Sequence, residues 1–133
     1  MTIPQLPFAL APIGFPFPAM AGLAGRLPLG GGREVALALL SVSRLASGLL
    51  PPDSLPLEDR QHRATAARVW LASLALPAAL RVPLAKAIDA TAIGPIPAAG
   101  ALRVVASAAG TYIDAAASLE IERLVRRLAA IAR

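Results

Sequence analysis

Thirteen prolines in a chain of 133 residues limit how long any regular element can be. Proline has no backbone N–H and a fixed φ angle, so it interrupts the interior of a helix and of a central strand alike. Six of the thirteen lie in residues 1–32, and the others separate apolar segments farther along the chain. The sequence therefore predicts that some of its elements are short and broken by proline.

The first two segments after residue 32 have helical periodicity. In residues 33–50, apolar side chains recur at intervals of three and four, and the "PPDS" sequence ends this helix. A second helix is expected over 57–76, because Asp53 or Ser54 can cap it and acidic residues occupy its first turn.

The second half of the chain is also expected to be helical. Pro77 and Pro83 can each open a short helix, and the "GPIP" sequence predicts a turn. The last element is expected to be one alanine-rich helix over about 98–132, which Gly100 or Gly110 could split. We therefore predict an all-α protein with four to five helices.

The N-terminal residues 1–32 are predicted to be an extended Pro- and Gly-rich docking arm, followed by a helical domain over 33–133. A disordered tail is normally polar, whereas this arm is apolar, so exposing it to water is costly. Two interpretations stay open: the arm packs on the chain's own core, or it docks on another protein or on lipid. We predict five docking residues: Phe8, Phe15, Phe17, Met20 and Trp70.

Composition favours a protein that needs a partner. Hydrophobic residues make up 56% of the chain, but aromatic residues only 4%, and most of the rest are alanine and leucine. Alanine buries little area, so this chain can build only a modest core. The net charge is +5, which favours an anionic partner, and Lys86 is the single lysine among the thirteen basic residues.

The C-terminal residues show two patterns. Apolar residues spaced 4, 3, 4 and 3 form two heptads and predict either helix pairing with a partner or packing on the chain's own core; they are Ala117, Ile121, Leu124, Leu128 and Ile131. Three arginines outside this face, Arg123, Arg126 and Arg127, are predicted to contact an anionic partner. A polar stripe is predicted to be either a solvated face or the lining of a cavity; it contains Arg103, Ser107, Thr111, Asp114, Ser118 and Glu122.

No catalytic or metal-binding pattern stands out. The chain has no cysteine, and its single histidine, His62, follows Glu58 and Asp59 on a helix that we interpret as solvated. The glycine-rich sequence at 27–33 lacks the phosphate-loop pattern. We therefore expect neither an enzyme nor a cofactor.

The sequence does not predict a transmembrane helix. The best window, 98–119, contains Arg103 and Asp114, and two central charges nearly cancel the gain from an alanine-rich span. Amphipathic helices and an apolar arm suit a lipid surface better. The arginines are spread along the chain without stacking aromatics, which argues against nucleic-acid binding.

These observations favour a non-catalytic scaffold or accessory subunit of a homo-oligomer or a larger complex, near a membrane or lipid surface. One alternative is an amphipathic protein that coats lipid or granules, and another is a small nucleic-acid-binding protein. We expect a cytoplasmic location, with peripheral membrane contact as a further option.

Overall fold

The computed structural model describes residues 17–27, 32–51 and 54–131, and this part of the chain is helical without a strand. Its helices are α1 (Pro18–Arg26), α2 (Arg33–Ser47), α3 (Leu57–Ala72), α4 (Ala78–Ile93), α5 (Pro95–Ala108) and α6 (Ala115–Ile131). The all-α prediction is confirmed, but the described residues form six helices where four to five were expected.

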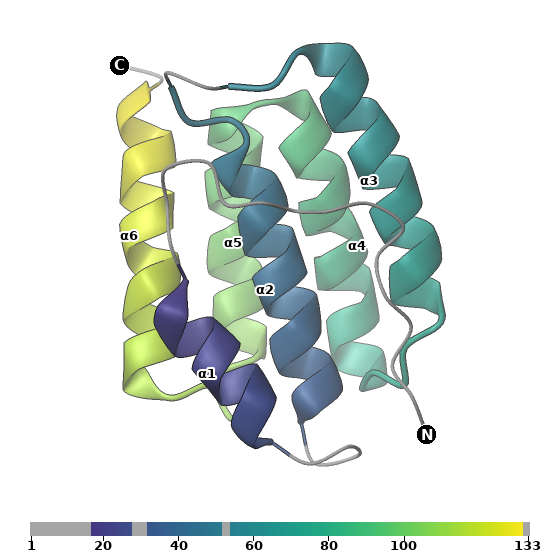
Figure 1. Ribbon diagram of the computed structural model, residues 1–133, viewed down its shortest axis with the longest axis vertical. Helices are drawn as coiled ribbons and strands as arrows, with labels where there is room; N and C mark the ends of the chain where they lie inside the picture. The colour runs from purple at the N-terminus through teal and green to yellow at the C-terminus, as the bar shows by residue number, and fades with distance from the viewer. Residues whose placement is uncertain (1–16, 28–31, 52–53, 132–133) are drawn as a thin grey trace.

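Helix α2 is the centre of the molecule and packs against each of the other five helices. Figure 1 shows it in front of α4 and α5, with α1 on one side and α3 on the other. Its alanines and leucines are almost all buried, and Leu39 is 0% exposed. Because alanine side chains are small, neighbouring helices can approach α2 closely from several directions.

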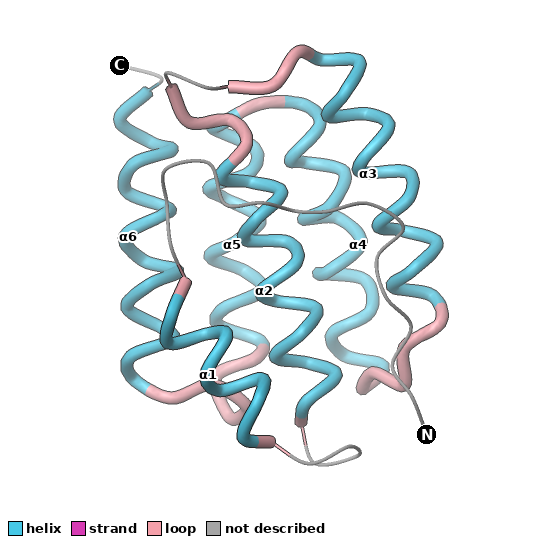
Figure 2. The backbone as a smooth tube through the Cα atoms, in the orientation of Figure 1, coloured by secondary structure: helices cyan, strands magenta, loops and turns pink. Residues whose placement is uncertain are grey.

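Helices α3 to α6 form a row in which each helix packs beside the next one in sequence. The connections are short, and Figure 2 shows them as brief loops at the two ends of the bundle. Gly94 alone joins α4 to α5, since it ends the first helix and begins the second. Short connections between consecutive helices favour antiparallel neighbours, so α4 and α5 form a helical hairpin.

Helix α4 runs through Pro83, where the sequence analysis predicted two short helices. Proline in a helix removes one hydrogen bond, here the bond to the carbonyl of Ala79, and its ring crowds that same carbonyl. Ala79 is exposed near the start of the helix, so water can replace the missing donor. The proline is therefore tolerated, and the predicted break does not occur.

The segment expected to be one helix over about 98–132 is two helices, separated by residues 109–114, which include Gly110, one of the two glycines at which a split was considered. Helix α5 begins earlier than expected, at Pro95, because proline fits the first position of a helix. Helix α6 begins after Asp114, whose Oδ1 accepts a hydrogen bond from the N–H of Ala117 at 2.8 Å. This N-cap fixes the start of a separate helix.

Part of the predicted extended arm is helical. Pro18 occupies the first turn of α1, where its missing N–H costs nothing, and good helix formers follow it. Met20 and Leu23 are buried, and α1 packs on α2 and α6. The described part of the arm therefore packs on the chain's own core, which was one of the two interpretations left open.

Candidate interaction surface

The outer face of the α4–α5 hairpin exposes large aliphatic side chains. Val82 and Ile93 on α4, with Ile96 and Val104 on α5, are between 58% and 68% exposed. Single exposed hydrophobic residues are normal on protein surfaces, so their number alone means little. Their location is informative, because all four lie on two helices that pack side by side.

Four of the exposed residues of α4 lie in one stripe, which we call the α4 stripe: Val82, Lys86, Asp89 and Ile93. The other exposed residues of this helix, Ala78, Ala79 and Arg81, lie near its N-terminus. The spacing within the α4 stripe is four, three and four residues. Residues at this spacing lie on one face of an α-helix, which has 3.6 residues per turn. The stripe therefore has an aliphatic residue at each end and a pair of opposite charges in the middle.

The two charged residues of the stripe have different surroundings. The carboxylate of Asp89 accepts a hydrogen bond from the guanidinium of Arg68 on α3 at 2.6 Å, through Oδ2, and its side chain is 49% exposed. Within residues 17–27, 32–51 and 54–131, Lys86 forms no ion pair, and it is exposed. The stripe thus offers one cation without a partner and one carboxylate that is open to solvent.

A groove of about 300 Å³ lies between α5 and α6. Apolar and polar side chains both line it. In chain order they are Arg103, Ala106, Ser118, Ile121, Glu122, Val125 and Arg126. Arg126 pairs with Glu122 at 2.7 Å. The predicted polar stripe is therefore divided: Arg103, Ser118 and Glu122 line this groove, whereas Ser107 and Thr111 are exposed outside it.

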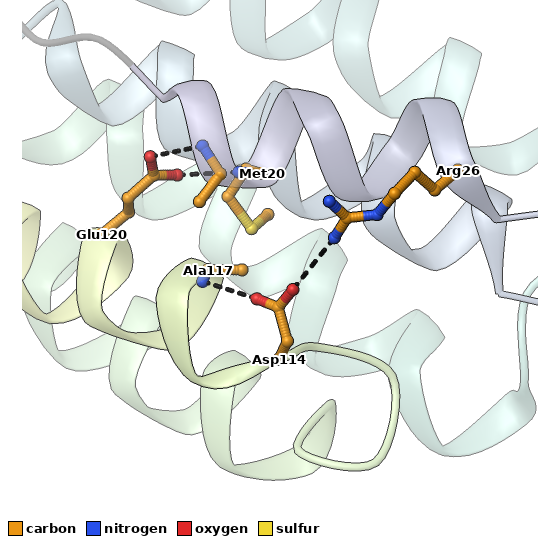
Figure 3. Close-up of polar contacts among 6 residues, drawn as sticks. Met20, Arg26, Asp114, Ala117 and Glu120 are labelled. Atoms are coloured by element: carbon orange, nitrogen blue, oxygen red, sulfur yellow. Dashed lines mark hydrogen bonds and ion pairs between the residues drawn. The ribbon is translucent and has the colours of Figure 1, made fainter.

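Helix α1 is held on α6 at both ends, as Figure 3 shows. The carboxylate of Glu120 accepts hydrogen bonds from the backbone N–H groups of Ala19 at 2.6 Å and Met20 at 2.8 Å. At the other end of α1, Arg26 forms an ion pair with Asp114 at 3.1 Å. Glu120 is 6% exposed, so its charge is satisfied by the N-terminus of α1, where the helix dipole favours an anion.

The predicted docking residues that the structure describes are not on the surface. Phe17, Met20 and Trp70 belong to the hydrophobic core and are at most 7% exposed. They have almost no area to offer to a partner in this fold. Phe8 and Phe15 lie outside the described residues.

The predicted pairing face of α6 mostly fills the chain's own core. Four of its residues, Ala117, Ile121, Leu124 and Leu128, are buried against the other helices, and only Ile131 is exposed, at 38%. The heptad pattern is therefore used within the molecule. A core-facing helix and a coiled-coil strand place apolar residues at the same spacing, so the sequence could not separate them.

The three arginines predicted to meet an anionic partner, Arg123, Arg126 and Arg127, are exposed on α6. Arg126 is paired with Glu122, one turn earlier in the same helix. An exposed pair of this kind contributes little to stability, and it lowers the net positive charge of this face.

Two other kinds of feature are absent from the described residues. No three His, Asp or Glu side chains gather there in a way that could hold a metal ion, and His62 is exposed on α3. None of the helices in that part of the chain is both long and apolar enough to cross a membrane.

Comparisons with known proteins give no assignment either. No protein-family model, no curated protein and no solved structure matches the chain.

The sequence analysis missed the α4 stripe. It treated Pro83 as a helix boundary, which assigned Val82 and Ile93 to separate elements. The signal was present in the spacing of Val82, Lys86, Asp89 and Ile93. It becomes meaningful only when one helix carries all four residues.

Proposed function

We propose that the protein is a non-catalytic scaffold or accessory subunit that acts through a protein–protein contact made by the outer face of α4 and α5. The observation that carries this proposal is the exposure of Val82, Ile93, Ile96 and Val104 on one hairpin. The described part of the arm packs on its own core, so the support comes from this hairpin and not from the arm.

The hairpin can stabilise a complex by burying these aliphatic side chains against a partner. Each Å² of apolar surface removed from water contributes about 25 cal/mol, before the costs of association are subtracted. The surroundings also suit a contact surface, since Lys86 and Asp89 supply polar groups beside the aliphatic ones.

The test is the mass of the protein purified from its own host without detergent, by native mass spectrometry. We expect a complex of fixed stoichiometry that is lost when Val82→Asp and Ile93→Asp are combined. The matched control is Val69→Asp on α3, because Val69 is 71% exposed but lies on another helix. A complex that survives the double substitution, or an unmodified protein that is monomeric at every concentration measured, would contradict the proposal.

The same preparations separate the alternatives. A lipid coat gains helicity or binds when anionic vesicles are added, and the double substitution weakens that binding. A nucleic-acid-binding protein binds oligonucleotides with an affinity that falls steeply as salt rises. Neither response is expected here. A strong response of either kind, without a protein complex, would replace the scaffold by that alternative.

A further inference from the structure

We propose that the partner of the α4 stripe is a second copy of this chain, and that two α4 helices pack antiparallel about a two-fold axis level with residues 87 and 88. This inference rests on the proposed function and names the partner of the same surface.

The arrangement of the stripe is self-complementary under this axis. A two-fold axis at this level places Val82 opposite Ile93 of the second copy, and Lys86 opposite Asp89 of the second copy. Two-fold contacts are isologous, so each of these pairs occurs twice. The aliphatic residues meet at both ends of the contact, and opposite charges meet at its centre. A parallel pairing would instead place each residue opposite its own copy, with like charges facing one another.

The charged groups are placed to make these contacts. Lys86 has no ion-pair partner within the described part of its own chain. The hydrogen bond from Arg68 uses Oδ2 of Asp89, and the Asp89 side chain is 49% exposed. The ammonium of Lys86 from the second copy can therefore bind Oδ1 without displacing Arg68. Lys86 is also the only lysine of the chain.

The area of the α4–α5 face determines how strongly the proposed dimer is expected to associate. Helix α4 has 16 residues and is therefore about 24 Å long, and two helices side by side are about 20 Å wide. A face-to-face contact of two hairpins buries on the order of 500 Å² per copy, or roughly 1,000 Å² in total, near the lower limit for a specific interface. Such a contact also covers Ile96 and Val104 on α5. We therefore expect a reversible dimer that dissociates on dilution.

Cysteine cross-linking tests the antiparallel register directly, because the chain has no cysteine of its own. Full-length chains carrying Val82→Cys or Ile93→Cys are mixed and oxidised. The mixture is expected to give a disulfide-linked dimer that contains one chain of each kind. Either variant alone is expected to stay uncross-linked, since in an antiparallel pair its two cysteines are about 17 Å apart, whereas a disulfide needs Cα atoms within about 7 Å.

Light scattering over a range of concentrations measures the dimer itself. Lys86→Glu places an acidic group opposite Asp89 in both central pairs and is expected to raise the dissociation constant at least about tenfold. The control is Arg123→Glu on α6, which changes the net charge equally but lies off the α4 stripe. This variant is expected to leave the dissociation constant unchanged. Circular dichroism is used to check the folding of both variants, and both are expected to be folded because the substituted positions are exposed.

The outcomes separate this inference from the proposed function. Cross-linking of Val82→Cys alone, or a dimer without the mixed cross-link, overturns the antiparallel pairing. A purified chain that stays monomeric at all concentrations also overturns it. If the host complex is nevertheless lost on combining Val82→Asp with Ile93→Asp, the proposed function stands with a different partner. If that double substitution leaves the host complex intact, both fail.

Discussion

The carboxylate of Glu120 on α6 accepts a hydrogen bond from the backbone N–H of Met20 on α1, at 2.8 Å, although 100 residues separate them in sequence. The second carboxylate oxygen binds the N–H of Ala19. Phe17, the N-cap residue of α1, offers no capping side chain, so Glu120 supplies the cap from another helix. The contact anchors α1 to the rest of the bundle.

Replacing this cap is expected to loosen α1. Glu120→Ala leaves two N–H groups without their acceptor and should lower the free energy of unfolding by about 1–3 kcal/mol. Hydrogen exchange of the Ala19 and Met20 amides should accelerate in the same variant. Glu122→Ala is the control on the same helix, because its exposed pair with Arg126 contributes less than about 0.5 kcal/mol. Equal losses in both variants would contradict the assigned cap.

Asp114 has two roles that substitution can separate. Its Oδ1 caps α6, and its Oδ2 pairs with Arg26 on the surface. Asp114→Asn keeps an effective N-cap and loses only an exposed ion pair, so urea unfolding should change by less than about 0.5 kcal/mol. Asp114→Ala removes the cap as well and should cost about 1 kcal/mol. Equal losses for Asn and Ala would assign the effect to the ion pair.

Gly32, the N-cap residue of α2, has a φ of 104°, a backbone conformation that residues with a side chain rarely adopt. A Cβ atom there would also lie 3.4 Å from carbons of Leu27 and Tyr112. Gly32→Ala should therefore lower the free energy of unfolding by about 1–3 kcal/mol. The control is Gly25→Ala in α1, which has nothing within 4 Å and should raise stability by up to about 1 kcal/mol. Thermal unfolding of the two variants should shift in opposite directions.

Ser43 is fully buried on α2, and its hydroxyl has no hydrogen-bond partner in the described structure. Ser43→Ala removes a desolvated polar group and should raise the free energy of unfolding by about 1 kcal/mol. Ser47, also buried, is the comparison, because its hydroxyl donates to the carbonyl of Arg44 at 2.6 Å. Ser47→Ala should lower stability by about 0.5–1.5 kcal/mol. A loss of stability in Ser43→Ala would show that its hydroxyl is satisfied.

The helices with strong periodicity were predictable from the sequence. Residues 33–50 and 57–76 correspond to α2 and α3 within a few positions at their ends, because a regular apolar face identifies a helix without knowledge of its neighbours. The helices that begin with a proline or contain one were not predictable in this way. Pro18 was expected in an extended arm, Pro95 in a turn and Pro83 at a helix boundary. Pro18 and Pro95 instead open helices, where a missing N–H costs little, and α4 continues through Pro83.

The interaction surface was harder to predict than the fold. Apolar residues in a sequence predict burial, and Phe17, Met20 and Trp70 are indeed buried, but in this chain's own core. A docking surface consists of apolar residues that the fold leaves exposed, such as Val82 and Ile93. Which residues remain exposed depends on how six helices pack, and local spacing does not contain that information.

The long-range cap of α1 has a consequence for synthesis on the ribosome. Ala19 emerges 101 residues before Glu120, the residue that holds it. At about 5–20 residues per second, the nascent chain waits roughly 5–20 seconds between the two. During that interval α2 has emerged but α6 has not, so Met20 and its neighbours lack the part of their binding site that α6 supplies. Helix α1, the first of the described helices to be translated, is thus expected to be among the last to dock, and cellular factors that shield apolar nascent segments would act on it during this interval.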